Sequence, residues 1–481
     1  MKQIAILCIL LFGVHAMDAQ DLKKAVMTDD LNELKLYVKK YGVNVPQKRY
    51  YPIVAAAKYG RLNFAKYLIE NGADINAREY KKRTALMYAI KNDFIDIALY
   101  LLEHQPDIML TDYKNQSALH IAHTVGNYDK IKAVLSENPF VQVDGPYIFS
   151  SKKKYTIITI RKDENGETYK DELVVLKDTG VVYSACYDTL GHLLFEFPIV
   201  RKIEVEKKAI FEDVDQIVAI SDIEGNYDEY VNLLISAKVM NEKYQWTFGT
   251  GHLVLIGDFF DRGSQVTECL WLTYYLEQQA LQTNGKVHFL IGNHEEMNLR
   301  GDFRYVNFKY IANADFMGKS YSNLYSKKSY LSKWLRKKNG LVKINGNLFV
   351  HAGISPEFAK KKYSLEHINR TIRSFVHKPP TLRMENEHAE LVFDTKNGPL
   401  WYRGLMKDPL EDEQVQKILD TYKAKKLIIG HTAVNEITSF YDQKVINIDV
   451  KHLLGSETSR ALLIKEGHYY SVGKEYKKRL F

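Results

Sequence analysis

The chain has 481 residues, more than one ordinary hydrophobic core accommodates, so we expect two or three domains. Hydrophobic residues make up 46% of the chain and charged residues 26%, a balance that excludes disordered, collagen-like and coiled-coil proteins. The net charge of +8 comes from dispersed basic clusters, which we interpret as solvated surface, with an anion-binding surface as the alternative. We expect no nucleic-acid partner.

The first residues have the pattern of an export signal. Lys2 precedes an apolar run from Ile4 to Val14, which is too short to span a bilayer, and cleavage after Ala16 or Ala19 fits the rule for small residues. We predict a signal peptide over residues 1–19 and a protein exported to the periplasm or the extracellular space. A buried first helix is the alternative interpretation. No later segment is long and apolar enough to predict a membrane span.

A repeat with a period of 33 residues occupies the next part of the chain. Gly60, Asp93 and Gly126 keep this spacing, and each unit combines a short Ala-rich helix with a second apolar helix. The array resembles ankyrin repeats, because residues 71–76 (NGADIN) are close to the loop between repeats in that family. The resemblance implies an all-α solenoid of about four units over residues 20–139. We predict that it holds a protein partner; a purely structural extension is the alternative.

Alternating hydrophobicity replaces the helical period over residues 140–213. Asn165-Gly166 separates two alternating runs, residues 155–160 and 173–176, which is typical of a β-hairpin. We therefore predict a small antiparallel β module that connects the repeats to the next domain. Its expected role is a scaffold, with a share in substrate recognition as the alternative.

From residue 214 onward, short apolar runs end directly at residues that commonly bind metals. Each run is typical of a buried strand and is followed by Asp, Asn or His, usually beside a Gly that allows the backbone to turn sharply. Because sites in layered folds form at strand ends, we expect these side chains to converge. Carboxylate, amide and imidazole ligands suit Mn, Fe or Zn, so the residues alone predict a metal-dependent hydrolase. The runs cover residues 217–220, 253–256, 287–291, 348–350 and 427–429.

The motifs at these strand ends resemble the calcineurin-like metallophosphoesterase superfamily. Asp-x-x-Gly at 222–225, Gly-Asp-x-x-Asp-Arg-Gly at 257–263 and Gly-Asn-His-Glu at 292–295 occur in the family's order. The nearest branch is the serine/threonine phosphoprotein phosphatase family with its bacterial relatives. The resemblance implies an α/β domain over residues 214–481, built as a two-layered β-sandwich flanked by helices. Residues of about 300–339 interrupt the strand series and are expected to form a helical cap near the site mouth.

The same resemblance implies which residues hold two divalent ions. Asp258 would bridge both ions, and Asp222 would hold the first. The second would be held by Asn293, His351 and His431. Such a pair clamps a phosphate and lowers the pKa of a shared water.

Four further residues match the family's catalytic and substrate-binding positions. His294 would be the general acid that protonates the leaving alcohol, and Asp261 would orient it. Arg262 and Arg403 would bind phosphate oxygens in bidentate fashion.

One position departs from the family pattern. Asp222 is followed two residues later by Glu224, where the family normally has His. If Glu224 ligates through oxygen, the first position favours Mn or Mg over Zn. If Glu224 points elsewhere, one metal is weakly held. We expect two ions, with Mn as the leading candidate and Fe, Zn or Mg as alternatives.

These observations predict an exported metal-dependent phosphatase that hydrolyses phosphate monoesters. The expected substrate is a phosphorylated protein or small molecule. One alternative is a nucleotide or dinucleoside polyphosphate hydrolase, which shares the motifs. The other is a binding protein in which the ankyrin repeats bind the partner and the phosphatase-like domain is catalytically silent.

Overall fold

The computed structural model describes residues 22–131 and 141–481, apart from Lys48, Gln105, Met109, Asn115, Thr179, Leu453, Leu454 and Ser456. The signal peptide expected at residues 1–19 lies outside the described residues and stays a prediction. The chain divides into two compact units, Met1–Pro139 and Phe140–Phe481. Within the described part of the chain, no helix has the length and hydropathy that a membrane crossing requires.

The first unit is a stack of short helices that bury their small apolar faces against each other. Helix α3 packs on α4 and α5, and α5 packs in turn on α6 and α7. Gly60 lies in the turn after α3 with a φ of 72°, and a Cβ there would lie 2.7 Å from the Phe94 ring, so this turn favours glycine. The helices are α2 (Leu31–Tyr41), α3 (Pro52–Lys58), α4 (Leu62–Glu70), α5 (Ala85–Lys91), α6 (Ile95–Glu103), α7 (Ala118–Val125) and α8 (Tyr128–Ile131).

The second unit begins with the expected antiparallel β module, which forms two small sheets rather than one. Phe197 stacks on Trp271 of the following domain with 4.6 Å between ring centroids, and Trp271 Nε1 donates to Pro146 O at 2.9 Å. The module is therefore packed against the α/β domain that follows it. One sheet contains β1 (Asp144–Ser150), β2 (Lys154–Lys162) and β3 (Thr168–Leu176), and the other contains β4 (Val182–Tyr187) and β5 (Leu193–Ile199).

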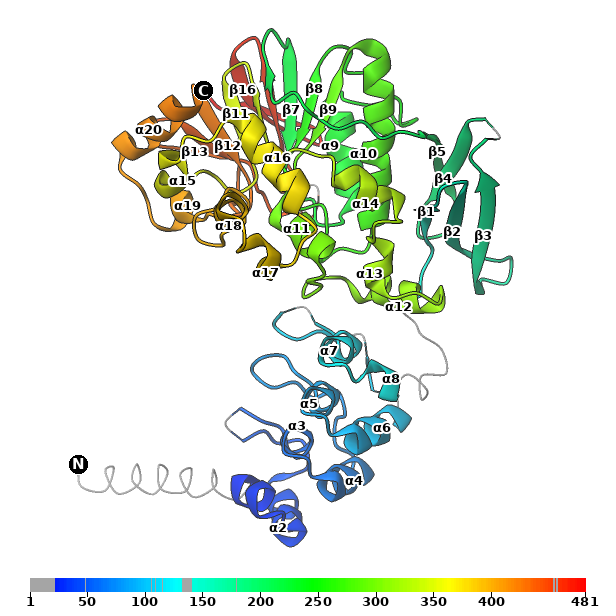
Figure 1. Cartoon of the computed structure of the whole chain (residues 1–481). Coiled ribbons are helices and arrows are strands. Elements are labelled where there is room, and N and C mark those ends of the chain that lie inside the picture. The colour runs from blue at the N-terminus through cyan, green and yellow to red at the C-terminus, as the bar shows by residue number, and fades with distance from the viewer. Residues whose placement is uncertain are drawn as a thin grey trace, which may run out of the picture. The chain divides into compact units, whose positions relative to one another are not determined.

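Two six-stranded sheets form the body of the second unit (Figure 1). Strands β7, β8 and β9 run parallel in one sheet, and β11, β12 and β14 run parallel in the other. The first sheet has the order β17 (Tyr476–Arg479), β16 (His468–Gly473), β15 (Ala461–Lys465), β7 (Gln216–Ile220), β8 (His252–Leu255) and β9 (Lys286–Phe289). The second has the order β13 (Thr438–Phe440), β14 (Val445–Asn447), β12 (Lys426–Ile429), β11 (Asn347–Val350), β10 (Leu341–Ile344) and β6 (Ile210–Phe211).

The core lies between the two sheets. Ile217 and Ala219 of β7 share one buried cluster with Phe349 and Ile428 of the other sheet. Their neighbours in β7 point to the opposite face and are buried as well, because helices cover the outer faces. Figure 1 shows this arrangement, with α9 and α10 against the first sheet and α16 against the second. The predicted two-layered β-sandwich flanked by helices is confirmed.

The helices of this unit connect the strands and carry part of the site. Between β9 and β10, α12 and α13 pack together and α14 packs on β1. The helices are α9 (Tyr227–Ser236), α10 (Val266–Ala280), the 3-10 helix η2 (Leu281–Thr283), α11 (Asn293–Arg300), α12 (Phe308–Phe316), α13 (Tyr321–Leu324), α14 (Tyr330–Leu335), α15 (Pro356–Lys360), α16 (Leu365–Phe375), α17 (Pro380–Arg383), α18 (Glu387–Val392), α19 (Gly404–Lys407) and α20 (Asp412–Tyr422).

Candidate active site

The loops that follow five strands of the sandwich meet at one place. Their backbones approach so closely that a Cβ on Gly257 would lie 2.5 Å from the Gly292 nitrogen. Several site residues that are not glycine adopt the left-handed backbone region, which is sparsely populated and typical of functional sites. These residues, with their φ angles, are Asp222 (54°), Glu224 (51°), Asp258 (57°), Asp261 (73°), Arg262 (58°) and His431 (67°).

A cluster of metal-type ligands lies at this meeting point. One ligand atom each from Asp258, His351 and His431 lies within 4.8 Å of the others, and all three residues are buried. His351 Nε2 lies 3.2 Å from Asp258 Oδ2, 3.1 Å from His431 Nδ1 and 2.8 Å from Asn293 Oδ1. The structure therefore brings together four of the predicted metal ligands, two from each sheet of the sandwich.

The imidazoles of this cluster are oriented as metal ligands require. His351 Nδ1 donates to Ile256 O at 2.7 Å, and His431 Nε2 donates to Trp401 O at 3.1 Å. Each ring therefore turns its other nitrogen toward Asp258, which is the usual arrangement of a metal-binding histidine with an outer partner. The donor set of carboxylate, amide and imidazole fits a divalent ion.

The charges of the cluster also favour a cation. Burial alone would raise the pKa of Asp258, but the neighbouring imidazoles hold it well below its ordinary value, so the carboxylate is ionised. Burial alone would lower the pKa of His351, yet the Asp258 and Asp222 carboxylates raise it to about 10.

Asp222 lies beside the cluster, at the end of β7. Its Oδ2 accepts a hydrogen bond from the His431 backbone nitrogen at 3.1 Å and another from the Ser221 hydroxyl. Burial raises the pKa of Asp222, and the charge of Asp258 raises it further. Asp222 is 7% exposed and lines an open pocket with a volume of about 390 Å³.

His294 and Asp261 form a buried pair beside the cluster. His294 Nδ1 donates to Asp261 Oδ2 at 2.5 Å, while His294 Nε2 remains 3.7 Å from Asp258 Oδ2. Burial alone would lower the pKa of His294, but the Asp258 charge and the bond to Asp261 raise it above its ordinary value. His294 also lines the pocket, and with Nδ1 bound to Asp261 its Nε2 is the ring nitrogen that a general acid would use.

Two arginines and one glutamate occupy the pocket wall. Arg403 Nη1 donates to His431 O at 2.6 Å, which holds its guanidinium beside the cluster. Arg262 is paired with Glu224, so the structure turns the Glu224 side chain toward that arginine. The predicted site residues that line the pocket are Asp222, Glu224, Asp258, Arg262, His294, Arg403 and His431.

Three residues of the site had no role in the sequence analysis. Glu295 accepts hydrogen bonds from the backbone nitrogens of Asp258, Phe259 and Gly292, each at 2.8 Å, and so fastens two ligand loops together. Asn298 Nδ2 donates to Asp261 at 2.9 Å. Only Glu295 had a sequence signal, as the last residue of Gly-Asn-His-Glu.

Asp449, the third of these residues, lines the pocket from the loop after β14. It lies far along the chain from the motifs, and a single Asp after a short apolar run did not stand out. Its surroundings in the fold are what identify it.

Replacing Glu295 by Gln is expected to lower the free energy of unfolding of the metal-free protein by about 1–3 kcal/mol, because an amide NH₂ would face a backbone donor. Chemical denaturation followed by circular dichroism measures this change. The matched control Glu357→Gln removes an exposed carboxylate paired with Lys360 and should shift the value by less than about 0.5 kcal/mol. Equal effects of the two substitutions would contradict the role given to Glu295.

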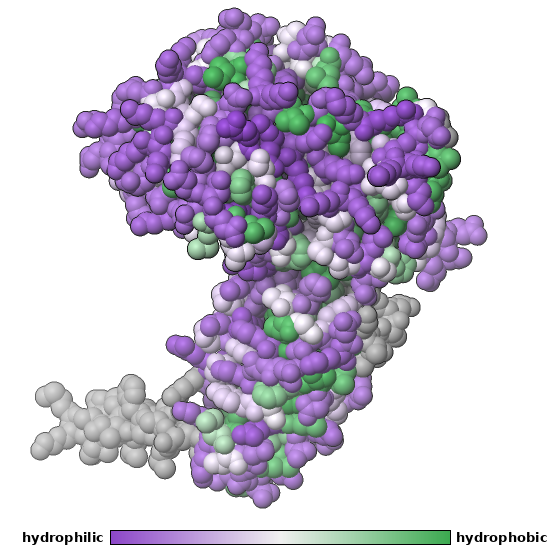
Figure 2. Space-filling view, in the orientation of Figure 1, coloured by the Kyte–Doolittle hydropathy of each residue, from purple (hydrophilic) through white to green (hydrophobic). Residues whose placement is uncertain are grey.

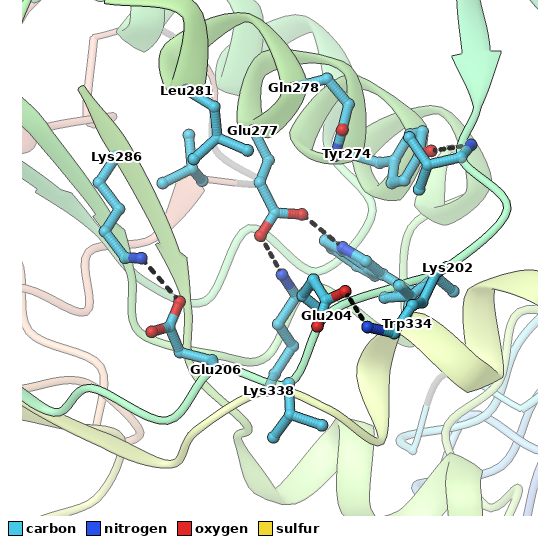
Figure 3. A pocket seen from close by; sticks show the side chains of 14 residues that line it. Lys202, Glu204, Glu206, Tyr274, Glu277, Gln278, Leu281, Lys286, Trp334 and Lys338 are labelled. Carbon is cyan, nitrogen blue, oxygen red and sulfur yellow. Dashed lines mark hydrogen bonds and ion pairs between the residues drawn. The ribbon is translucent and has the colours of Figure 1, made fainter. Parts of the chain in front are cut away.

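A second pocket of about 250 Å³ lies between the β5–β6 connection and helices α10 and α14 (Figure 3). Its charged groups pair with one another: Lys286 with Glu206 at 3.0 Å, and Lys338 with Glu277. Trp334 Nε1 also donates to Glu277 at 2.6 Å. Because these charged groups already pair with one another, they offer a ligand no uncompensated charge, and we assign the pocket no function.

Comparisons with known proteins agree with this geometry. Family models match residues 22–112 and 82–145 as ankyrin repeats (3 copies) and residues 216–435 as a calcineurin-like phosphoesterase. The solved cold-active protein-tyrosine phosphatase of a psychrophilic Shewanella species is 30% identical with a TM-score of 0.64, and the match covers 71% of this chain and 100% of that one. The chain belongs to the calcineurin-like metallophosphoesterases. The resemblance drawn from the motifs is thereby confirmed.

This calcineurin-like metallophosphoesterase also has relatives among eukaryotic proteins. It is 30% identical over 233 residues to Shewanella-like protein phosphatase 1 of Plasmodium berghei (strain Anka), a match that covers 45% of this chain and 61% of that protein. It is 26% identical over 287 residues to Shewanella-like protein phosphatase 2 of Arabidopsis thaliana, covering 50% and 72% of the two chains. The family makes the chain an enzyme of the phosphoesterase class, with ankyrin repeats before its catalytic domain.

Proposed function

We propose that this protein is a phosphatase that hydrolyses phosphate monoesters with the help of two divalent metal ions. The observation that carries the proposal is the buried cluster of Asp258, His351 and His431 beside a pocket of about 390 Å³. The pocket is also lined by His294 and by two arginines, the groups that an anionic phosphate ester needs.

Each residue of the site has a distinct task in this proposal. Metal ions bound there would supply an activated water and compensate the charge of the phosphate. Arg262 and Arg403 bind the non-bridging phosphate oxygens through their planar guanidinium groups. His294 passes a proton from Nε2 to the leaving oxygen, and Asp261 keeps the ring in place through Nδ1. The metals would be held by Asp222, Asp258, Asn293, His351 and His431.

Mn is the proposed metal, because three of the five proposed ligands, Asp222, Asp258 and Asn293, offer oxygen donors. Fe, Zn and Mg are the alternatives. The carboxylates of Asp222 and Asp258 make the site harder than a thiolate or all-imidazole site.

The proposed substrate is a phosphorylated protein. Two relatives are named protein phosphatases, and the similar Shewanella structure is named a protein-tyrosine phosphatase. The open pocket accommodates the end of a side chain that reaches in from a protein surface. These similarities favour phosphotyrosine over nucleotide substrates.

Phosphatase assays on purified protein with Mn test this choice. We expect kcat/KM for a phosphotyrosine peptide to exceed that for a dinucleoside polyphosphate by at least about 10-fold, a difference of about 1.4 kcal/mol in transition-state binding. Phosphoserine and phosphothreonine peptides of the same sequence measure the preference among phosphoproteins. A clear preference for the dinucleoside polyphosphate would contradict the protein substrate.

The ankyrin unit supports a protein partner through its exposed aromatic residues. Tyr80 and Tyr113 are 33 residues apart and about half exposed, and Lys81 lies over both rings, at 5.4 Å and 5.9 Å from their centroids. Figure 2 shows hydrophobic residues lying among hydrophilic ones on this unit. Tyrosine is enriched in protein interfaces, so we propose a protein partner for the array.

We also propose export to the periplasm or the extracellular space. The apolar run from Ile4 to Val14 supports this proposal. Expression with the complete N-terminus, cell fractionation and mass determination test it. The expected protein lies outside the cytoplasm and begins after Ala16 or Ala19; a cytoplasmic protein with its first residues intact would contradict export.

A further inference from the structure

The pocket contains a carboxylate that no recognised motif includes. Asp449 follows β14, is 6% exposed, and lines the pocket together with Asp222 and Asp258. Among the residues that the structure describes, none donates a hydrogen bond to the Asp449 carboxylate, although backbone groups and side chains satisfy Asp222 and Asp258. The Asp449 oxygens therefore face the pocket with lone pairs that no described donor occupies.

The loop that carries Asp449 is fixed against the end of β7. The Asp449 backbone nitrogen donates to Asn447 Oδ1 at 3.0 Å, and its carbonyl accepts from Val434 N at 2.8 Å. Three residues later, His452 Nε2 donates to Ser221 O at 3.0 Å. Ser221 immediately precedes Asp222, so these contacts hold Asp449 on the side of the cluster that Asp222 occupies.

The carboxylates of Asp222, Asp258 and Asp449 line one pocket. Arg262 acts on both Asp222 and Asp449 by its charge, but its guanidinium is paired with Glu224. A divalent cation held between these carboxylates would compensate their charge.

Glu224 stands where the family has a metal-binding histidine, yet its side chain reaches Arg262 on the pocket wall. An ion held by Asp222 would therefore lack the ligand that the family's Asp-x-His pattern would supply. Asp449 is a buried oxygen donor with free lone pairs on the same side of the cluster. Its chemistry fits the vacant ligand position.

We propose that Asp449, rather than Glu224, supplies the remaining protein ligand of the metal ion held by Asp222. The proposal rests on the proposed function, because it concerns the metal centre of that phosphatase. Glu224 then acts as a positioning residue that holds Arg262 at the pocket wall. Replacement of an imidazole by a carboxylate makes this position oxygen-rich, which favours Mn or Mg over Zn.

Metal counting on the full chain tests the proposal independently of catalysis. The measurements are Mn per chain by elemental analysis after equilibrium dialysis, and the Kd of each ion followed by electron paramagnetic resonance of free Mn. We expect two ions in the unaltered protein and in Glu224→Gln. In Asp449→Asn, the Kd of the more weakly bound ion should rise by at least about 10-fold, since even outer partners of metal ligands contribute 10–100-fold to affinity.

A double variant separates loss of a ligand from loss of the fold. Glu224→His combined with Asp449→Asn restores the family's Asp-x-His pattern, so it should regain the second ion that Asp449→Asn alone loses. Asp442→Asn is the matched control, because Asp442 is an exposed aspartate in the same half of the domain. It should bind both ions as the unaltered protein does.

Three results would overturn the proposal. If Glu224→Gln binds one ion fewer while Asp449→Asn still binds two, Glu224 is the ligand and Asp449 is not. Retention of both ions in Asp449→Asn together with a raised KM would make Asp449 a partner of Arg262 only. Failure of the double variant to regain the ion would show that Asp449 acts through the fold. If the unaltered protein binds two ions but hydrolyses no phosphate ester, the proposed function fails while the ion counts still decide the role of Asp449.

Discussion

Replacing His294 by Ala is expected to lower kcat for phosphopeptide hydrolysis by about 10²–10⁴-fold, the usual contribution of a positioned general acid. Its Nδ1 is bound to Asp261 at 2.5 Å, so Nε2 is the atom that can deliver a proton at the pocket. The loss should be much smaller for an aryl phosphate with an acidic leaving group, which departs without a proton. Steady-state kinetics with both substrates measure the difference.

His192→Ala is the matched control for this variant. His192 forms the same kind of pair with Asp188, at 3.0 Å, on an exposed turn of the β module. Its removal should leave kcat unchanged for both substrates. An equal loss for the aryl phosphate and the phosphopeptide in His294→Ala would contradict proton donation and assign His294 to substrate or metal binding.

Replacing Asp258 by Asn is expected to lower activity by at least about 10³-fold and to reduce the number of bound metal ions per chain. The amide keeps the size of the side chain and can still accept from the His294 backbone nitrogen, as Asp258 Oδ1 does at 2.9 Å. It removes the negative charge next to His351 and one of the two oxygens that a bridging ligand needs. Phosphatase assays and elemental analysis on the same samples measure both effects.

Asp442→Asn controls for the change of Asp to Asn at a left-handed backbone position. Asp442 has a φ of 49°, close to the 57° of Asp258, but is exposed to solvent. Its substitution should alter neither activity nor metal content. Full metal content in Asp258→Asn would contradict the role of Asp258 as a shared ligand.

The parts of the fold that depend on local sequence could be predicted. A buried strand that ends at Gly-Asp or Gly-Asn leaves its signal within a few residues, and the ankyrin period is visible in the spacing of Gly60 and Gly126. The position of each site residue at a strand end follows from the same local pattern. For this reason Asp258 and His294 could be singled out without coordinates.

Features that depend on contacts between distant segments could not be predicted. The pairing of Glu224 with Arg262 is decided by loop geometry, and the sequence analysis left open whether Glu224 ligates or points elsewhere. Asp449 has no motif around it, so only its burial beside Asp222 identifies it. Likewise, alternating hydrophobicity predicted strands in the β module but not their division into two sheets. Which strands pair depends on contacts in the folded chain and leaves no local signal in the sequence.

The left-handed backbone conformation at Asp258, Asp222 and their neighbours lowers the stability of the fold, while the side chains at these positions are needed for activity. Glycine would relieve the torsional penalty at these positions, of order 1–3 kcal/mol each, but it would delete the side chains on which turnover depends. Selection for heat resistance alone would therefore drive these sites toward inactive sequences. Efforts to make the enzyme more durable are better directed to the ankyrin helices and the outer helices of the sandwich.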